Sequence, residues 1–347
     1  GALVDPFGGI QDLAKGIIRT PLDPYVTFSD DPLRMLRAVR FATKLSTDQQ
    51  SFVIVPECLE AIKAMKDRMV ILSKERIVEE LNKILITKHP SIGFNLLDQT
   101  GLIDYVLPAL ARLKGIETVD GRGHKDNFSH TLQVVDNVCA DEERAGQEPN
   151  LWLRWAALLH DIGKPVSKRF DPGIGWMFHG HEVVGARMVP KIFQELKMPQ
   201  NEKMKYVQKL VGLHHRPVAL VDDEVTDSAV RRLLFDAGNE IDDLMLLCNA
   251  DITSKNPAKV VRLRRNFELV REKLVLVEEK DAIRNFKNPI TGEYVMEVYG
   301  IGPSNVIGVI KERVKNAILD GEIENNFEAA DALMRAFAPE LGLVAVK

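Results

Sequence analysis

The segment LWLRWAALLHDIGK, residues 151–164, decides how this sequence folds. Residues 151–159 are apolar except for one arginine, which predicts a buried helix, and the pair His160–Asp161 follows directly. Burying an ionised Asp beside a His is unfavourable unless a partner compensates its charge. A divalent cation is a natural partner, because imidazole nitrogen and carboxylate oxygen together suit Mn, Fe, Co, Ni or Zn. The segment therefore predicts a helical domain built around a metal site.

The bulk composition is that of an ordinary helical protein. With 347 residues the chain is too long for one compact core, and 45% of its residues are hydrophobic and 28% charged. No apolar run approaches the roughly 20 residues of a membrane span, so we expect no membrane partner. Cys58, Cys139 and Cys248 form no CxxC pair, which favours a reducing, cytoplasmic location.

The histidines are concentrated in one part of the chain. Seven of the eight lie between His124 and His215. A single histidine in a helical protein is usually a surface or core residue, but here an ordered series stands beside apolar helical runs. The series is His130, His160–Asp161, His179 with His181, His214–His215 and Asp251. Lys164 follows His160 by one helical turn, where its ammonium group could hold a phosphate oxygen.

This series resembles the HD superfamily of metal-dependent phosphohydrolases, and LLHDIGKP (residues 158–165) is among its most specific short motifs. The resemblance implies two sets of ligands with Asp161 bridging them, and it makes Asp161 and Lys164 the candidate catalytic residues. The first set is His130, His160, Asp161 and Asp251, and the second adds His181, His214 and His215. Two metals would activate a water and clamp a phosphoester during in-line attack.

A second motif lies near the beginning of the chain, in DDPLRMLRAVRFA, residues 30–42. Arg34, Arg37 and Arg40 recur every three residues of a predicted helix that Asp31 precedes. An Asp and an Arg one turn apart can hydrogen-bond the Watson–Crick edge of a base. From the spacing alone, an exposed salt bridge worth a few tenths of a kcal/mol is the simpler interpretation.

The sequence around this motif favours base recognition over an exposed salt bridge. VDPFGGIQDLAKGIIRT (4–20) followed by DPLRMLRAVRFATKL (31–45) resembles the CCA-adding tRNA nucleotidyltransferases of the bacterial poly(A) polymerase family. The resemblance implies tRNA as partner and selection of CTP or ATP by Asp31 and Arg34, with Asp30 where the family usually has Glu. SKERIVEEL (73–81), which contains Arg76, resembles a later motif of the helical neck. A poly(A) polymerase of the same family, and a non-catalytic RNA-binding body with a structural metal, remain as alternatives.

These observations predict an elongated, all-α protein in four segments. Residues 1–25 are a remnant of an α/β nucleotidyltransferase head, 26–118 a neck and RNA-binding domain, 119–256 the phosphohydrolase and 257–347 a C-terminal helical body. A basic helix at 257–285 could follow a phosphate backbone through Arg262, Arg264 and Arg265, and a solvated helix face is an equally good interpretation.

The resemblance also generates a prediction about transfer activity. The family's polymerising site binds two Mg²⁺ ions and CTP or ATP through a Gly-Ser loop and a DxD pair, and neither motif precedes residue 30. We therefore expect this chain to be a fragment that keeps phosphoester hydrolysis, on 2′,3′-cyclic or terminal phosphates, and lacks nucleotide addition. Incorporation of labelled CTP or ATP into tRNA by this chain alone would contradict that expectation.

Overall fold

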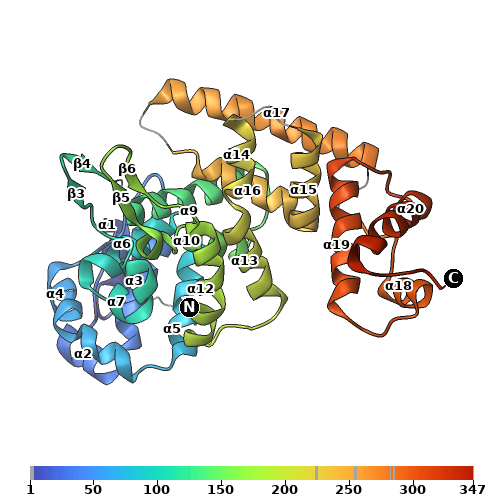
Figure 1. Ribbon diagram of the computed structural model, residues 1–347. Helices are drawn as coiled ribbons and strands as arrows, with labels where there is room; N and C mark the ends of the chain where they lie inside the picture. The colour runs from blue at the N-terminus through green and yellow to red at the C-terminus, as the bar shows by residue number, and fades with distance from the viewer. Residues whose placement is uncertain are drawn as a thin grey trace. The chain divides into compact units, whose positions relative to one another are not determined.

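The computed structural model describes residues 4–124, 126–222, 226–253, 256–281, 283 and 286–346 (Figure 1). Helices hold 68% of the residues, which confirms the predominantly α fold expected from the sequence. The chain divides into two compact units, the first Gly1–His215 with Leu246–Lys255, the second Arg216–Met245 with Asn256–Lys347. The four segments expected from the sequence divide the chain more finely and stay a prediction.

The first half of unit 1 is a set of short helices with one small parallel sheet, in which Ile17 pairs with Val53. Helix α5 is capped by Ser73, whose side chain accepts a hydrogen bond from the Arg76 amide. The elements are α1 (Gly9–Lys15), β1 (Ile17–Ile18), α2 (Pro24–Asp30), α3 (Leu33–Leu45), β2 (Val53–Ile54), α4 (Pro56–Met65), η1 (Lys66–Ile71), α5 (Lys74–Leu85), α6 (Pro90–Thr100), α7 (Ile103–Val106) and α8 (Pro108–Ala111).

The second half of unit 1 is a helical bundle interrupted by two small antiparallel hairpins, β3–β4 and β5–β6. Figure 1 shows α12 and α13 packed side by side, and α10 contacts α5, α9 and α13. The elements are β3 (Thr118–Val119), β4 (Arg122–Gly123), α9 (Asn127–Arg144), α10 (Leu151–Leu159), α11 (Lys164–Ser167), β5 (Arg169–Asp171), β6 (Gly175–Met177), α12 (His181–Glu195), α13 (Glu202–Leu213) and the end of α16 (Ile241–Asp251).

Helix α10 lies in the interior of this bundle, because it is apolar except for Arg154 and residues 153–159 are all buried. Its first turn is capped by Asn150, whose side chain accepts from the amides of Trp152 and Leu153. The indole of Trp155 is fully buried and donates to Asn82 on α5 at 2.8 Å. These contacts fix the axis of the helix whose last turn carries the HD pair.

One buried ion pair ties α10 to its neighbours. The Arg154 guanidinium lies 2.7 Å from a carboxylate oxygen of Glu142 on α9, with both side chains at most 3% exposed. Its Nη1 also donates to the carbonyl oxygens of Leu85 and Thr87, each at 2.7 Å, at the end of α5. Glu142 in turn accepts from the Asn150 amide. The pair satisfies backbone groups at the end of α5 and just before α10, and both of its side chains have little contact with water.

Unit 2 has its own apolar core, in which α18, α19 and α20 meet around residues such as Val298, Ile310 and Met334. Asp320 on α19 accepts two hydrogen bonds from the Arg232 Nη2 on α15, at 2.9 and 2.8 Å. The elements are α14 (Arg216–Asp222), α15 (Asp227–Ala237), η2 (Gly238–Glu240), the start of α16, α17 (Pro257–Asp281), α18 (Gly292–Tyr299), α19 (Asn305–Asp320), α20 (Phe327–Phe337) and η4 (Ala338–Leu341). No helix in the described ranges has the length and apolar character needed to cross a bilayer.

Replacing Arg154 by Leu should destabilise unit 1, because the Glu142 carboxylate would stay buried without a partner. Loss of one member of a buried pair costs about 3–5 kcal/mol. Urea unfolding followed by tryptophan fluorescence measures this, since all three tryptophans lie in unit 1. Lys63→Ala, which removes an exposed pair with Glu60, is the control and should cost less than about 1 kcal/mol. Equal losses in the two variants would contradict the assignment.

Candidate metal centre

The HD pair stands at the point where α10 ends. His160 continues the helical backbone as the C-cap, and both His160 and Asp161 are at most 1% exposed. The chain then turns through Gly163 and starts α11 at Lys164. A Cβ at position 163 would lie 2.1 Å from the carbonyl oxygen of His181, so this turn can approach α12 only with glycine. That close approach brings the start of α12 beside Asp161.

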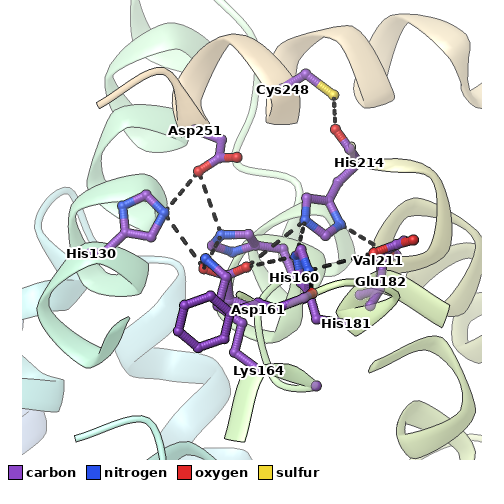
Figure 2. A network of polar contacts seen from close by, with 12 residues as sticks. His130, His160, Asp161, Lys164, His181, Glu182, Val211, His214, Cys248 and Asp251 are labelled. Carbon is purple, nitrogen blue, oxygen red and sulfur yellow. Dashed lines mark hydrogen bonds and ion pairs between the residues drawn. The ribbon is translucent and has the colours of Figure 1, made fainter. Parts of the chain in front are cut away.

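Four further helices carry the remaining candidate ligands (Figure 2). His130 comes from α9 and His181 from the first residue of α12, where Gly180 takes a left-handed conformation with φ of 72°. His214 and His215 follow the last residue of α13. Asp251 ends α16.

Two asparagines hold the end of α16 against α9. Asn137 donates to the Ala250 carbonyl at 2.8 Å, and Asn249 donates to Asp141 at 3.0 Å. They fix the helix end that carries Asp251. Asp251 lies within reach of His130 as a result, its oxygen 2.9 Å from the imidazole Nε2.

The buried imidazoles share one orientation. Nδ1 of His160, His181 and His214 lies 2.7–2.8 Å from the backbone oxygen of the residue three positions earlier. Nδ1 of His130 lies 2.9 Å from the Thr253 hydroxyl. A ring that donates from Nδ1 to a carbonyl directs its Nε2 towards the centre, where a bound metal ion would take the place of any proton on that atom.

The Nε2 atoms converge on the two oxygens of Asp161. Oδ2 lies 3.3 Å from His160 and 3.6 Å from His130, whereas Oδ1 lies 3.2 Å from His181 and 3.9 Å from His214. Within each of two groups of residues, the possible ligand atoms all lie within 4.8 Å of one another. They are His130, His160 and Asp251, and His181, His214 and His215. Asp161 therefore stands between two sets of donors, one on each oxygen.

Burial and charge act in opposite directions on these groups. Burial lowers the pKa of an imidazole, but the carboxylates of Asp161 and Asp251 outweigh it and raise the pKa of His160 to about 10. His214, equally buried, has its pKa lowered by burial to about 3. Burial acts to raise the pKa of Asp161, and His160, His181 and Lys164 nevertheless hold it well below the usual range. Burial likewise acts to raise the pKa of Asp251, and His130 and His160 hold it well below the usual range. Both carboxylates therefore stay ionised, which favours a cation beside them.

The donor set fits a divalent transition metal. His160 Nε2 is fully buried and has no hydrogen-bond partner among the residues that the structure describes, although carboxylate oxygens lie 3.3 and 3.6 Å away. A buried polar atom without a partner is costly, and coordination would satisfy it. Neutral imidazoles combined with carboxylates are the ligands that Mn, Fe, Co, Ni and Zn accept.

The centre opens into a pocket of about 610 Å³. His181, His215, Lys164 and Glu182 line it on one side. The ammonium group of Lys164 lies 2.6 Å from Asp161 Oδ2 and 17% of its side chain is exposed, so it joins the buried centre to the pocket. His179 also lines the pocket but is exposed and belongs to neither donor group.

The predicted nucleotide-binding residues occupy different environments within unit 1. Arg34 and Arg37 line a pocket of about 370 Å³ together with Phe41. Asp31 instead accepts from the Leu33 amide and pairs with Arg76 at 3.1 Å, which joins two motifs predicted separately.

Arg40 departs from the set of predicted nucleotide-binding residues. It does not line that pocket, because its guanidinium lies 2.7 Å from the buried carboxylate of Glu80. Arg262, Arg264 and Arg265 are exposed on α17 in unit 2.

Sequence patterns alone missed two parts of the centre. Thr253 holds His130 by its hydroxyl, and no local pattern marks a threonine as an orienting residue. The hairpin β5–β6 stands inside a stretch expected to be helical, and its strands are only three residues long. The signal that could have found it is FDPGIGWMF (170–178), in which Pro-Gly and Gly separate two aromatic segments.

Two family profiles match the chain. Residues 51–114 match the probable RNA- and SrmB-binding site of polymerase A, and residues 127–254 match the HD domain. The second range contains every histidine and aspartate of the metal centre. An A-adding tRNA nucleotidyltransferase of Deinococcus radiodurans is 31% identical over 341 residues, which covers 96% of this chain and 74% of that protein. The chain belongs to the family of CCA-adding tRNA nucleotidyltransferases.

Other members of the family extend the comparison. A multifunctional CCA protein of Nitrosococcus oceani is 32% identical over 269 residues, covering 74% of this chain. The chain spans only 60% of that relative. The crystal structure of the Bacillus stearothermophilus CCA-adding enzyme in complex with CTP shares the fold, with a TM-score of 0.60, 22% identity, and coverage of 98% of this chain and 70% of that one. These comparisons confirm the family that the sequence motifs indicated.

Replacing Gly163 by Ala should weaken metal binding, because the new Cβ would collide with the His181 carbonyl and displace the start of α12. Loss of a group that orients a metal ligand typically costs about 10- to 100-fold in affinity, and we expect that range here. Metal titration of the chelator-treated protein measures it. Gly212→Ala is the matched control, since its Cβ would meet only the Ala186 side chain at 3.4 Å. Unchanged affinity in Gly163→Ala would show that the turn does not position the ligands.

Proposed function

We propose that this centre is a metal-dependent phosphohydrolase site that acts on phosphoesters at the 3′ end of tRNA, as 2′,3′-cyclic phosphodiester or terminal phosphate. The observation that carries the proposal is the position of Asp161, whose two oxygens face two histidine sets at the end of an open pocket. Two-metal sites that hydrolyse phosphoesters hold two ions close together, and Asp161 would offer one oxygen to each ion.

Each residue has a stated part in the proposal. One ion would be held by His130, His160, Asp161 and Asp251, and a second by His181, His214, His215 and the other oxygen of Asp161. Bound Ni, Mn, Fe, Co or Zn would supply an activated water and neutralise charge on the phosphate. Lys164, at the mouth of the centre, would orient a phosphate oxygen by its ammonium group.

The cysteines do not offer a competing nucleophile. Burial raises the pKa of Cys139 to about 12, and burial likewise raises the pKa of Cys248 well above its usual value. Both thiols therefore stay protonated at neutral pH, whereas the thiolate is the nucleophilic form. Cys58 is buried too. The proposed attack by water uses neither thiol.

A purely structural metal is the alternative that the ligand count disfavours. Closed structural sites are saturated by about four protein ligands and have no open position. Here the two donor groups hold five histidines and Asp251 in addition to Asp161, and His181 and His215 line a pocket. Surplus ligands beside an opening favour a site that exchanges water and substrate.

We further propose that the chain contributes recognition of the nucleotide and the tRNA to tRNA 3′-end maturation or repair, in which nucleotidyltransferases of this family add nucleotides from CTP or ATP with Mg²⁺. Asp31, Arg34 and Arg37 would recognise the incoming base, and Arg76, Arg262, Arg264 and Arg265 would contact the tRNA. Arg40 is better explained by its pair with Glu80. A poly(A) polymerase of the same family is the second candidate, and the name of the Deinococcus radiodurans relative favours tRNA.

Hydrolysis of 2′,3′-cyclic AMP and of bis-p-nitrophenyl phosphate tests the phosphohydrolase. Asp161→Ala should lower kcat by more than about 100-fold, because loss of a merely orienting group already costs up to that factor. It should also reduce the bound metal, measured by elemental analysis. Glu195→Ala removes an exposed carboxylate from α12 and should match the wild type. A wild-type chain that binds no transition metal and cleaves neither ester would favour the structural alternative.

A further inference from the structure

The hairpin β5–β6 lies between the two segments that flank Asp161. Lys164 begins α11 just before the hairpin, and His181 begins α12 just after it. The register pairs Phe170 with Trp176, so these two rings lie opposite each other with centroids 5.2 Å apart. Two residues further on, Phe178 points to the same side of the chain as Trp176. The hairpin therefore brings aromatic side chains next to the metal centre.

The indole of Trp176 is fixed although it is only half-buried. Its Nε1 donates to the Arg122 carbonyl at 3.0 Å, and Arg122 itself donates to the carbonyl oxygens of Pro172 and Gly173 in the hairpin turn. The ammonium group of Lys168 lies 4.9 Å from the centre of the indole ring. A ring held by its edge in this way loses little conformational freedom when a ligand packs on it.

The pocket is lined by two chemically different sets of residues. His181, His215, Lys164 and Glu182 are the polar set and include residues of the metal centre. Trp176, Phe178 and the 75% exposed Ile174 are the apolar set, and the Lys164 ammonium group lies 5.6 Å from the centre of the Phe178 ring, where the two sets meet. A volume of about 610 Å³ is in the range of small-molecule sites and accommodates a mononucleotide. A phosphate held by the polar set would place the rest of a nucleotide beside the aromatic rings.

We propose that the β5–β6 hairpin is a base-stacking platform, on which the base of the nucleoside phosphate substrate packs against Trp176 and Phe178. The inference rests on the proposed phosphohydrolase function and names the residues that would hold the base of its substrate. Stacking accepts any base, because every base has a π-face, so little discrimination among the four bases should follow. The ligand is the terminal nucleoside 2′,3′-cyclic phosphate, free or at an RNA end.

The test compares adenosine 2′,3′-cyclic phosphate with glycerol 1,2-cyclic phosphate, which has the same five-membered phosphodiester ring and no base. The measured quantity is the ratio of kcat/KM for the two substrates. Trp176→Leu keeps an apolar side chain without a π-face, and should reduce this ratio by about 5- to 150-fold, the value of one stacked base. Trp176→Phe keeps a ring and should retain most of the wild-type ratio. The bound metal of both variants is measured to check that the centre is intact.

Binding separates failure of this inference from failure of the proposed function. Dissociation constants of both compounds for the full chain carrying Asp161→Asn, by calorimetry, should show the same preference for the nucleoside and its loss with Trp176→Leu. Preferential binding without turnover in the wild type would overturn the hydrolase and support the platform. A ratio equal in wild type, Trp176→Leu and Trp176→Phe would overturn the platform and leave the hydrolase. A trinucleotide that ends in the cyclic phosphate distinguishes the two forms of the substrate. It reacts faster than the free nucleotide if the substrate is an RNA end, and slower if the substrate is the free nucleotide.

Discussion

The burial of the Asp161 carboxylate is the constraint on which the rest of unit 1 depends. A carboxylate that is 1% exposed requires positive charge close by. Lys164 supplies one such charge, and the imidazoles from several helices could hold metal ions that supply more. The apolar helix α10 carries Asp161 to the centre of the bundle, and the Arg154–Glu142 pair fixes that helix against α9 and α5. Stability and function are therefore coupled, because the elements that form the core also set the positions of the ligands.

Orientation of the ligands is achieved mainly by the backbone. Three imidazoles donate to the carbonyl three residues earlier, so helical geometry itself selects the Nε2 lone pair for the centre. His130 uses a side chain, Thr253, for the same purpose. Gly163 lets the turn after α10 touch the start of α12, where a methyl group would not fit. We propose that these features prepare the site before any metal arrives, which reduces the free-energy cost of binding.

Much of this centre could be predicted from the sequence, because its ligands stand beside long apolar runs that can only be buried helices. The apolar run before His160 and the apolar run before Asp251 predict that two carboxylates, Asp161 and Asp251, lie at the ends of helices in the interior of a bundle. The role of Arg40 could not be read in this way, since its pairing with Glu80 joins α3 to α5 and depends on how those helices pack. The β5–β6 hairpin could not be predicted either, because strands of three residues show too little alternation of polar and apolar side chains. Its aromatic side chains matter only through their position beside Asp161.

The central claim is that Asp161 bridges two divalent metal ions. A crystal of the full chain grown with Mn²⁺ or Ni²⁺, with anomalous diffraction recorded at the absorption edge of the metal, tests it directly. The claim predicts two anomalous peaks about 3.5–4 Å apart, with Nε2 of His130 and His160 about 2.0–2.3 Å from one and Nε2 of His181 and His214 similarly close to the other. A single peak would contradict the claim, whether that metal ion lies far from Asp161 or is bound by only one oxygen of Asp161.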